Sequence, residues 1–172
     1  NFDNVSNIEV ISLTHTTTNV AITTKDILVA AGAALTLQAT TLTTGILTFN
    51  GSAETNGTFN ITGGGAADVI TGGAGNDILD GGAGNNVITA GLGNDTITGG
   101  SGSETFTFAA ATGLTSADSV DGSSGTDTVA LTGNTAFTAS NDFDNIRNIE
   151  TITLANTNTA VTITTKDILV AS

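Results

Sequence analysis

Apolar and polar residues alternate in short stretches along the chain, and glycine, asparagine and threonine separate the stretches. In the middle of the chain the alternation takes a strict period of nine residues, in five consecutive copies between Gly63 and Thr107. The eighth residue of every copy is apolar: Ile70, Leu79, Ile88, Ile97 and Phe106. One inward-facing apolar residue between polar neighbours predicts a minimal β-strand. The block therefore predicts five short strands joined by glycine-rich bends.

The flanking residues alternate in the same way but without the fixed period. Apolar residues two positions apart predict further short, half-buried strands. These pairs are Ile11 and Leu13, Val20 and Ile22, Leu35 and Leu37, Leu47 and Phe49, and Phe59 and Ile61. Abundant Thr, Val and Ile favour extended backbone, so the expected class is all-β.

Residues 24–32 depart from this alternation. Thr24 can cap a helix, Asp26 fits its first turn, and Gly32 can end it. We therefore predict a short helical turn here, and the same turn at residues 165–167, where the text recurs. Residues 109–118 carry a weak signal and are predicted to form a loop. Residues 122–130 form a degenerate sixth nonapeptide that is out of phase with the block.

The sixth residue of each copy bears an oxygen ligand: Asp68, Asp77, Asn86, Asp95 and Glu104. One spacing thus repeats a core residue, an oxygen ligand and a glycine-rich bend. Glycine lets backbone carbonyls turn toward a cation, and calcium takes six to eight oxygen ligands. The pattern favours calcium held between the coils of a solenoid over a metal-free solenoid in which Asp and Asn only make turns.

The block resembles the RTX nonapeptide G-G-x-G-x-D-x-U-x, where U is a large apolar residue. The copies read GGGAADVIT, GGAGNDILD, GGAGNNVIT, AGLGNDTIT and GGSGSETFT, and they depart from the pattern at Ala66, Asn86, Ala90 and Glu104. The resemblance implies a right-handed parallel β-solenoid, a calcium β-roll with two nonapeptides in each coil. We expect flanking β-strand coils to cap or continue this roll, because its open ends would expose strand edges and core.

Two nonapeptides per coil place every second copy in the same stack of bends. Asp77 and Asp95 then face one calcium site, which should be the strongest by ligand charge. Asp68 and Asn86 form the next site, and the pair of Asn86 with Glu104 is the weakest or empty. The resemblance also implies ligands from backbone carbonyls, and those expected at the first site belong to Gly73, Gly75, Ala90 and Leu92.

A second set of acids follows the block, at Asp118, Asp121, Asp127, Asp142 and Asp144. Metal binding and solvated loop acids are equally good interpretations of this set, and Asp127 is the member in register with the degenerate nonapeptide. Glu9 and Glu150 are expected to serve turns or ladders.

Charge and composition narrow the function. Three cationic residues stand against 16 acids, which gives a net charge of −13. This balance excludes nucleic acid and anionic membrane surfaces as partners and favours divalent cations. The sequence has no cysteine, no long apolar run for membrane insertion and no recognisable catalytic motif. The single histidine, His15, is expected at the surface, so we expect no enzyme and no cofactor besides several Ca²⁺ ions.

A longer repeat sets the domain plan. Residues 2–31 match residues 143–172 at a constant offset of 141, with 20 identities in 30 positions. We expect a tandem array, in which residues 1–62 form N-terminal strand coils, 63–107 the calcium roll, 108–141 a loop with the degenerate nonapeptide, and 142–172 the start of the next module.

These features predict a calcium-dependent structural module of a large secreted or surface-anchored bacterial protein. RTX proteins of this kind include surface-layer proteins and adhesins exported by type I secretion, in which identical modules in a surface lattice are further partners. Two alternatives stay open. One is the folding module of a secreted hydrolase, and the other is an ice-binding surface built on stacked Thr71, Thr89 and Thr107.

Overall fold

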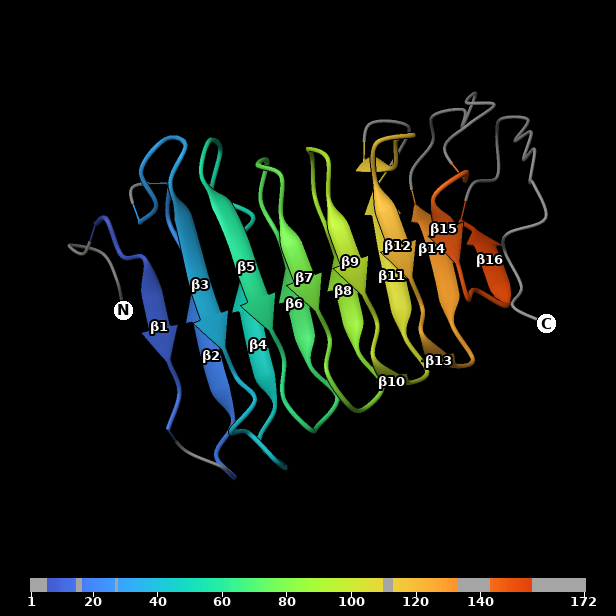
Figure 1. The fold of residues 1–172 in the computed structure, drawn as a ribbon, viewed down its shortest axis with the longest axis horizontal. Helices are drawn as coiled ribbons and strands as arrows, with labels where there is room; N and C mark the ends of the chain where they lie inside the picture. The colour runs from blue at the N-terminus through green and yellow to red at the C-terminus, as the bar shows by residue number, and fades with distance from the viewer. Residues whose placement is uncertain (1–5, 15–16, 27, 110–112, 133–142, 156–172) are drawn as a thin grey trace.

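The fold is a parallel β-solenoid of about six turns (Figure 1). It is seen in a computed structural model that describes residues 6–14, 17–26, 28–109, 113–132 and 143–155. Each turn contributes one strand to each of two seven-stranded parallel sheets. The predicted all-β solenoid is therefore confirmed. In the described part of the chain, no helix is long and apolar enough to cross a bilayer.

The two sheets take alternate strands along the chain. The first sheet contains, in spatial order, β1 (Val10–Ser12), β3 (Ala34–Gln38), β5 (Thr58–Thr62), β7 (Ile78–Asp80), β9 (Thr96–Thr98), β12 (Ser119–Asp121) and β15 (Ile146–Arg147). The second contains β2 (Val20–Thr23), β4 (Leu47–Asn50), β6 (Val69–Thr71), β8 (Val87–Thr89), β11 (Thr105–Ala109), β14 (Thr128–Thr132) and β16 (Thr151–Leu154). Two further short strands, β10 (Ser101–Gly102) and β13 (Ser124–Gly125), pair in the bends.

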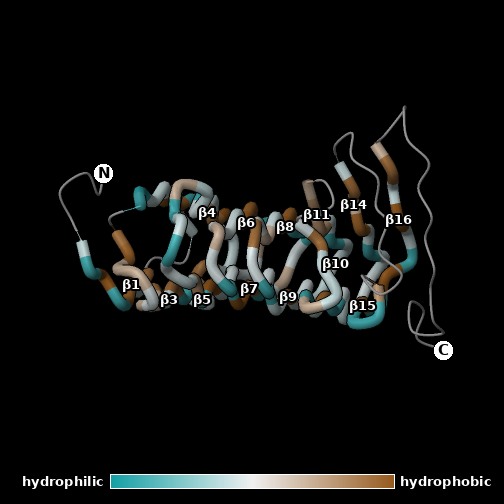
Figure 2. The backbone as a smooth tube through the Cα atoms, turned by 90° about the horizontal axis from the view of Figure 1, so that it is seen from above, coloured by the Kyte–Doolittle hydropathy of each residue, from teal (hydrophilic) through white to brown (hydrophobic). Residues whose placement is uncertain are grey.

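The core is a thin layer between the two sheets. Figure 2 shows the sheets as two rows, with β4, β6 and β8 opposite β5, β7 and β9. In each three-residue strand of the nonapeptide block the middle side chain is buried, whereas its two neighbours face outward. Phe49 and Phe59 join the sheets before the block, with ring centroids 5.0 Å apart in an edge-to-face arrangement. The eighth residues of the nonapeptides thus form the core that the pattern predicts.

Coil length changes along the solenoid. Within the block, Ile70 pairs with Ile88, so one coil takes two nonapeptides, as expected. Toward the N-terminus the coils are longer, since Leu35 pairs with Phe59. They are also longer toward the C-terminus, where Phe106 pairs with Val129. The extra residues lie in the bends, because the strands keep their register.

The 141-residue repeat is visible in the backbone. Asn7 and its counterpart Asn148 both adopt the left-handed conformation, with φ of 57° and 54°. The strands that follow them are β1 and β16, yet β1 belongs to the first sheet and β16 to the second. The two copies of the repeated sequence therefore form equivalent strands on opposite sides of the solenoid. The boundaries 1–62, 63–107, 108–141 and 142–172 stay predictions, and coils stack across 62/63 and 107/108 without a break.

The helical turn predicted at residues 24–32 is wrong for the described residues, which form non-helical turns. Leu28 N donates to Lys25 O at 2.9 Å, which closes a single turn. Thr24 does not cap a helix, because its Oγ1 and its amide both donate to Asn50 O of the next coil, at 3.4 and 2.9 Å. Pairing between coils thus overrides the local helix signal. The second predicted turn, at residues 165–167, lies outside the described residues.

Candidate metal sites

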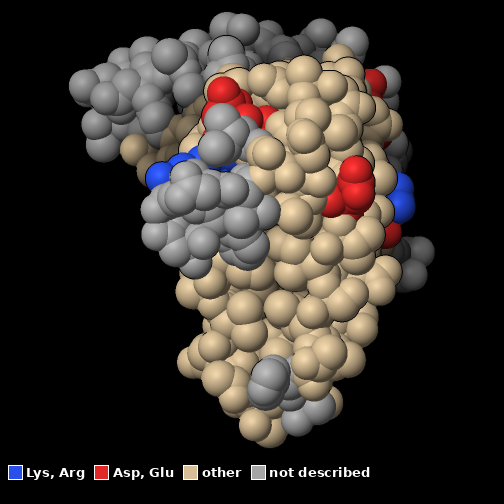
Figure 3. All heavy atoms as spheres, turned by 90° about the vertical axis from the view of Figure 1, so that its left-hand side faces the viewer, with Lys and Arg blue, Asp and Glu red and all other residues tan. Residues whose placement is uncertain are grey.

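The solenoid buries an unusual number of acids. Seven carboxylate side chains are at most 1% exposed: Glu54, Asp68, Asp77, Asp95, Glu104, Asp118 and Asp127. Acids are almost never fully buried unless they are paired. Three cationic residues in the whole chain cannot neutralise them. The outside is correspondingly poor in charge where Figure 3 shows it, at the β1 end, with only a few acidic side chains in view.

Asp77, Asp95 and Asp118 form a stack that we call the first ladder. Each immediately precedes a strand of the first sheet. Asp77 N donates to Asp95 Oδ1 at 2.8 Å, and Asp95 N donates to Asp118 Oδ1 at 2.7 Å. The structure thus places the predicted pair Asp77 and Asp95 in neighbouring coils and adds Asp118 as their continuation.

Asp68, Asn86, Glu104, Asp127 and Glu150 form the second ladder, on the other edge, and each precedes a strand of the second sheet. Asp68 N donates to Asn86 Oδ1 at 2.8 Å, and Glu104 N to Asp127 Oδ1 at 2.8 Å. Asp127 N donates in turn to Glu150 Oε2 at 2.6 Å, so Glu150 serves a ladder as expected. The predicted ligand Asp127 therefore extends the series one coil beyond the block, next to Glu104.

Each ladder replaces a row of the apolar core. Phe59 pairs with Leu35 inside the first sheet, and Phe59 N donates to Asp77 Oδ1 at 2.8 Å. On the other edge Leu47 N donates to Asp68 Oδ1 at 2.7 Å. The second carboxylate oxygen of Asp77 closes its own bend, since it accepts from Gly73 N at 2.8 Å. The side chain at this position of the coil therefore changes from apolar, in Phe59 and Leu47, to acidic where the nonapeptides begin.

Burial and mutual repulsion make these acids costly to ionise. Burial is the largest cause that raises the pKa of Asp77, to about 6, and Glu54 adds to it. Burial likewise raises the pKa of Asp95 to about 7, with further contributions from Asp77 and Asp118. The pKa of Glu104 rises to about 7 through burial and the neighbouring Asp127. Burial also raises the pKa of Asp68. Nearby positive charge would relieve this cost.

Several buried carboxylate oxygens have no hydrogen-bond partner in the described part of the protein. These are Asp95 Oδ2, Glu54 Oε2 and both oxygens of Glu104. An unsatisfied buried polar atom costs free energy comparable to a lost hydrogen bond, and an ionised one costs more. Orphaned oxygens beside stacked carboxylates are therefore suited to a cation.

The predicted carbonyl ligands line the bends of the first ladder. Gly73 O accepts from Leu92 N at 3.0 Å, so these two bends are in direct contact. A Cβ built on Gly91, whose φ is 111°, would collide with Gly73 O, and only glycine permits this approach. A Cβ built on Gly93 would likewise collide with Gly75 O, and one built on Gly72 with Ala90 O.

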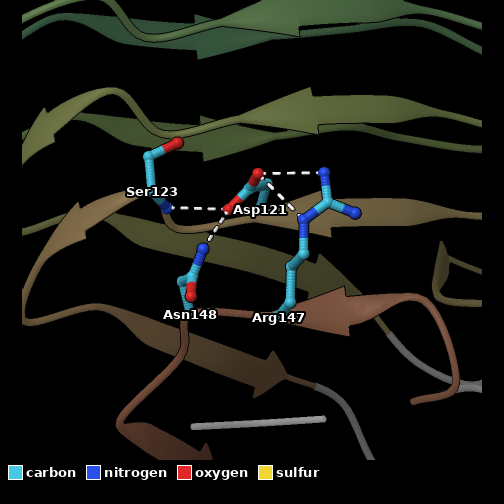
Figure 4. A network of polar contacts seen from close by, with 4 residues as sticks. All are labelled: Asp121, Ser123, Arg147 and Asn148. Atoms are coloured by element: carbon cyan, nitrogen blue, oxygen red, sulfur yellow. Dashed lines mark hydrogen bonds and ion pairs between the residues drawn. The ribbon is translucent and has the colours of Figure 1, made fainter. Parts of the chain in front are cut away.

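Other acids of the predicted second set have different roles. Asp121 lies at the outer surface, where Arg147 Nε and Nη2 both donate to its Oδ2 at 2.9 Å (Figure 4). Asn148 Nδ2 and Ser123 N donate to Asp121 Oδ1 at 2.7 and 3.0 Å. Burial acts to raise the pKa of Asp121, but these donors lower it overall. This acid is therefore satisfied without a metal.

Asp144 is half-buried and has polar contacts of its own. Asp142 and His15 lie outside the described residues. Glu54 was not predicted as a ligand, because it belongs to no nonapeptide. Its only sequence signal is a lone acid in a bend that contains Gly51 and Gly57.

Residues 60–88, 80–109 and 111–133 match the family of the RTX calcium-binding nonapeptide repeat (4 copies). These residues are RTX calcium-binding repeats. The match includes both acidic ladders as far as Asp127, and it extends beyond the five regular copies into the degenerate nonapeptide. No curated protein and no solved structure matches the chain.

The RTX bends fit calcium better than a metal that needs a side-chain cage. Among the described residues, no three His, Cys, Asp or Glu side chains converge on one point. Each gap between coils offers two acids or one acid and an amide, together with bend carbonyls. Calcium accepts such mixed oxygen sets, whereas zinc prefers nitrogen and sulfur ligands.

Proposed function

We propose that the chain is a calcium-dependent structural module of a large secreted or surface-anchored bacterial protein, of the surface-layer or adhesin type. The observation that carries the proposal is the burial of seven carboxylates in a chain with three cations. Without a divalent cation, these carboxylates oppose folding through desolvation and mutual repulsion.

In this proposal the protein's own residues prepare sites that are complete only outside the cell. Asp77 and Asp95 hold the strongest site, with Asp68 and Asn86 next, and bend carbonyls fill the remaining positions. Bound calcium supplies the positive charge that the ladders lack, so its binding free energy becomes folding free energy. The bends stay disordered where calcium is scarce, which suits export as an unfolded chain.

The surface-layer or adhesin role is supported by the long sequence repeat, because tandem modules suit a spacer or lattice better than a single enzyme tail. We propose no catalytic activity for the chain. Sedimentation of the purified chain with calcium and with chelator tests the lattice component: calcium-dependent association supports it, and a monomer under both conditions opposes it.

The decisive experiment is circular dichroism against free calcium. The chain has no Trp or Tyr, so β-sheet ellipticity is the appropriate signal. Asp77→Asn and Asp95→Asn should each raise the calcium midpoint about tenfold or more, because each removes a ligand charge. Asp80→Asn is the matched control, since Asp80 lies on β7 with its side chain outward. Equal β content of the parent chain in chelator at neutral pH would refute calcium-dependent folding.

Ice binding is a second candidate because the predicted threonine row exists. Thr71, Thr89 and Thr107 pair in register on β6, β8 and β11. The row ends at Asn50 on one side and Ala130 on the other. Thermal hysteresis in the presence of calcium separates the two functions, because only an ice-binding surface produces it.

A further inference from the structure

Glu54 is a buried acid outside the nonapeptides. It lies in the bend between β4 and β5 and is 1% exposed. Its Oε1 accepts from Gly57 N at 3.0 Å and from Asn56 N at 3.3 Å. Its Oε2 is equally buried and has no hydrogen-bond partner. The bend therefore holds a carboxylate of which one oxygen is unsatisfied.

This carboxylate lies in the bend that precedes the bend of Asp77 by one coil. Phe59 precedes Asp77 by one coil and fills the corresponding ladder position with an apolar ring. In the Glu54 coil an acid reaches the bend from another position instead. Glu54 O accepts from Ala74 N at 3.0 Å, as Gly73 O accepts from Leu92 N in the next coil. Glu54 thus stands where the second glycine of a nonapeptide would stand.

The bends of Glu54 and Asp77 lie against each other. A Cβ built on Gly73 would lie 2.9 Å from Glu54 O and 3.2 Å from Gly51 O, so only a glycine leaves this space open. Gly73 N is also the donor to Asp77 Oδ2. The negative charge of Glu54 contributes to the raised pKa of Asp77, after burial. The two acids therefore repel each other electrostatically across one gap between coils.

A pocket of about 390 Å³ opens at this place. Glu54 and Gly73 line it, together with residues of the following bend such as Gly91. Its lining includes no Lys, Arg or His, so no side-chain cation neutralises Glu54 there. Glu54 is the only acidic residue of this lining, and carboxylate and carbonyl oxygens are the ligands of a hard divalent cation.

We propose that Glu54 is a calcium ligand and that, with Asp77 and the carbonyls of the two bends, it forms a site one coil before the RTX repeats. This inference rests on the proposed function, since it extends calcium binding into the preceding coil. The added site ties the longer N-terminal coils to the roll, and calcium thereby controls the junction between the two.

The test counts calcium ions bound by the whole chain, by competition with a chromophoric chelator. Glu54→Gln should bind one ion fewer than the parent, or bind one ion at least tenfold more weakly. Glu9→Gln is the matched control, because Glu9 is an exposed Glu before β1 and its neutralisation should change nothing. Glu54→Asp keeps the charge but shortens the reach, so it should retain the ion with lower affinity.

The outcomes separate this site from the proposed function. A parent chain that binds no calcium defeats the proposed function itself. Calcium binding by the parent with unchanged ion number and affinities in Glu54→Gln overturns the Glu54 site alone. If Glu54→Gln lowers thermal stability in saturating calcium but leaves ion number and affinities as in the parent, the residue only holds the bend, and the site is likewise overturned.

Discussion

The backbone amide of Asp77 donates a hydrogen bond of 2.8 Å to Oδ1 of Asp95, one coil later. This bond fixes the carboxylate of one coil under the bend of the coil before it. One carboxylate therefore lies in each coil of the ladder, close to the carboxylate of the next coil. The backbone pairing alone brings these carboxylates close together. Folding should therefore depend on whether a cation neutralises their charge.

Asn86 offers the clearest single gain of function. Asn86 Nδ2 donates to Gly84 O at 3.1 Å, so the amide side chain stabilises its bend without a metal. Asn86→Asp removes that donor and adds a ligand charge. We expect a calcium midpoint about tenfold lower, measured by circular dichroism, together with weaker folding in chelator. Asn85→Asp, on an exposed neighbour, is the control, and an equal shift there would attribute the effect to net charge.

Acid should substitute for calcium. The folded-state pKa values of Asp77, Asp95 and Glu104 lie at about 6 to 7, above the roughly 4 of an unfolded chain. The calcium-free fold therefore binds more protons than the unfolded chain between about pH 4 and pH 7, and its stability falls as pH rises through that window.

In chelator, β-sheet ellipticity should thus increase when the pH is lowered from about 7 toward 4. Each pKa unit corresponds to about 1.4 kcal/mol for each carboxyl. With calcium the order reverses, because the ligands must be deprotonated, so the calcium midpoint should rise as the pH falls below about 7. A chelator-treated chain whose ellipticity is independent of pH would contradict the raised pKa values.

Gly91 and Gly32 distinguish a close approach from simple backbone strain. Both have positive φ, of 111° and 74°, but a Cβ on Gly32 would meet nothing within 4 Å. Gly32→Ala should cost about 1 kcal/mol, from backbone strain alone. Gly91→Ala adds the collision with Gly73 O and should cost about 1–3 kcal/mol more. Chemical denaturation in saturating calcium measures both, and equal losses would mean that the bend shifts freely.

Arg147 tests how much the surface pair matters. Its side chain is 54% exposed, and the equivalent residue of the first copy is Ser6. Arg147→Ser should lower the free energy of unfolding by less than about 1 kcal/mol, because solvent screens the pair and Asn148 still donates to Asp121. Asp121→Asn should cost more, since it weakens every bond in Figure 4. Thermal unfolding with calcium compares the two.

The regular part of the fold could be predicted because the apolar eighth residue of each nonapeptide fixes the position of a strand. Ile70 and Ile88 stack as their spacing requires, and so do Asp68 and Asn86 beside them. Coil length outside the block could not be predicted, since bends of different length bring Leu35 onto Phe59 and Phe106 onto Val129 with the same strand register.

Glu104 shows the limit of spacing arguments at the candidate sites. A count of two nonapeptides stacks it on Asn86, and the pairing of Phe106 with Ile88 keeps that stacking. The count does not reach Asp127, to which the amide of Glu104 donates across a longer coil. Glu54 escaped prediction because it lies in a bend outside the nonapeptides, where no repeat marks it. The prediction of a helical turn at Thr24 was wrong for a different reason. The helix signal there was local, whereas the amide of Thr24 donates to Asn50 O in the next coil.

The placement of β1 and β16 in opposite sheets determines how successive copies of the repeated sequence are oriented relative to one another. From β1 to β16 the chain changes sheet an odd number of times, so the 141-residue period contains a half-integral number of turns. An uninterrupted solenoid built on that period would rotate each successive copy by half a revolution about the long axis. Any patch on one copy would then reappear on the reverse side of the next, and the filament would show the same pair of faces to both sides.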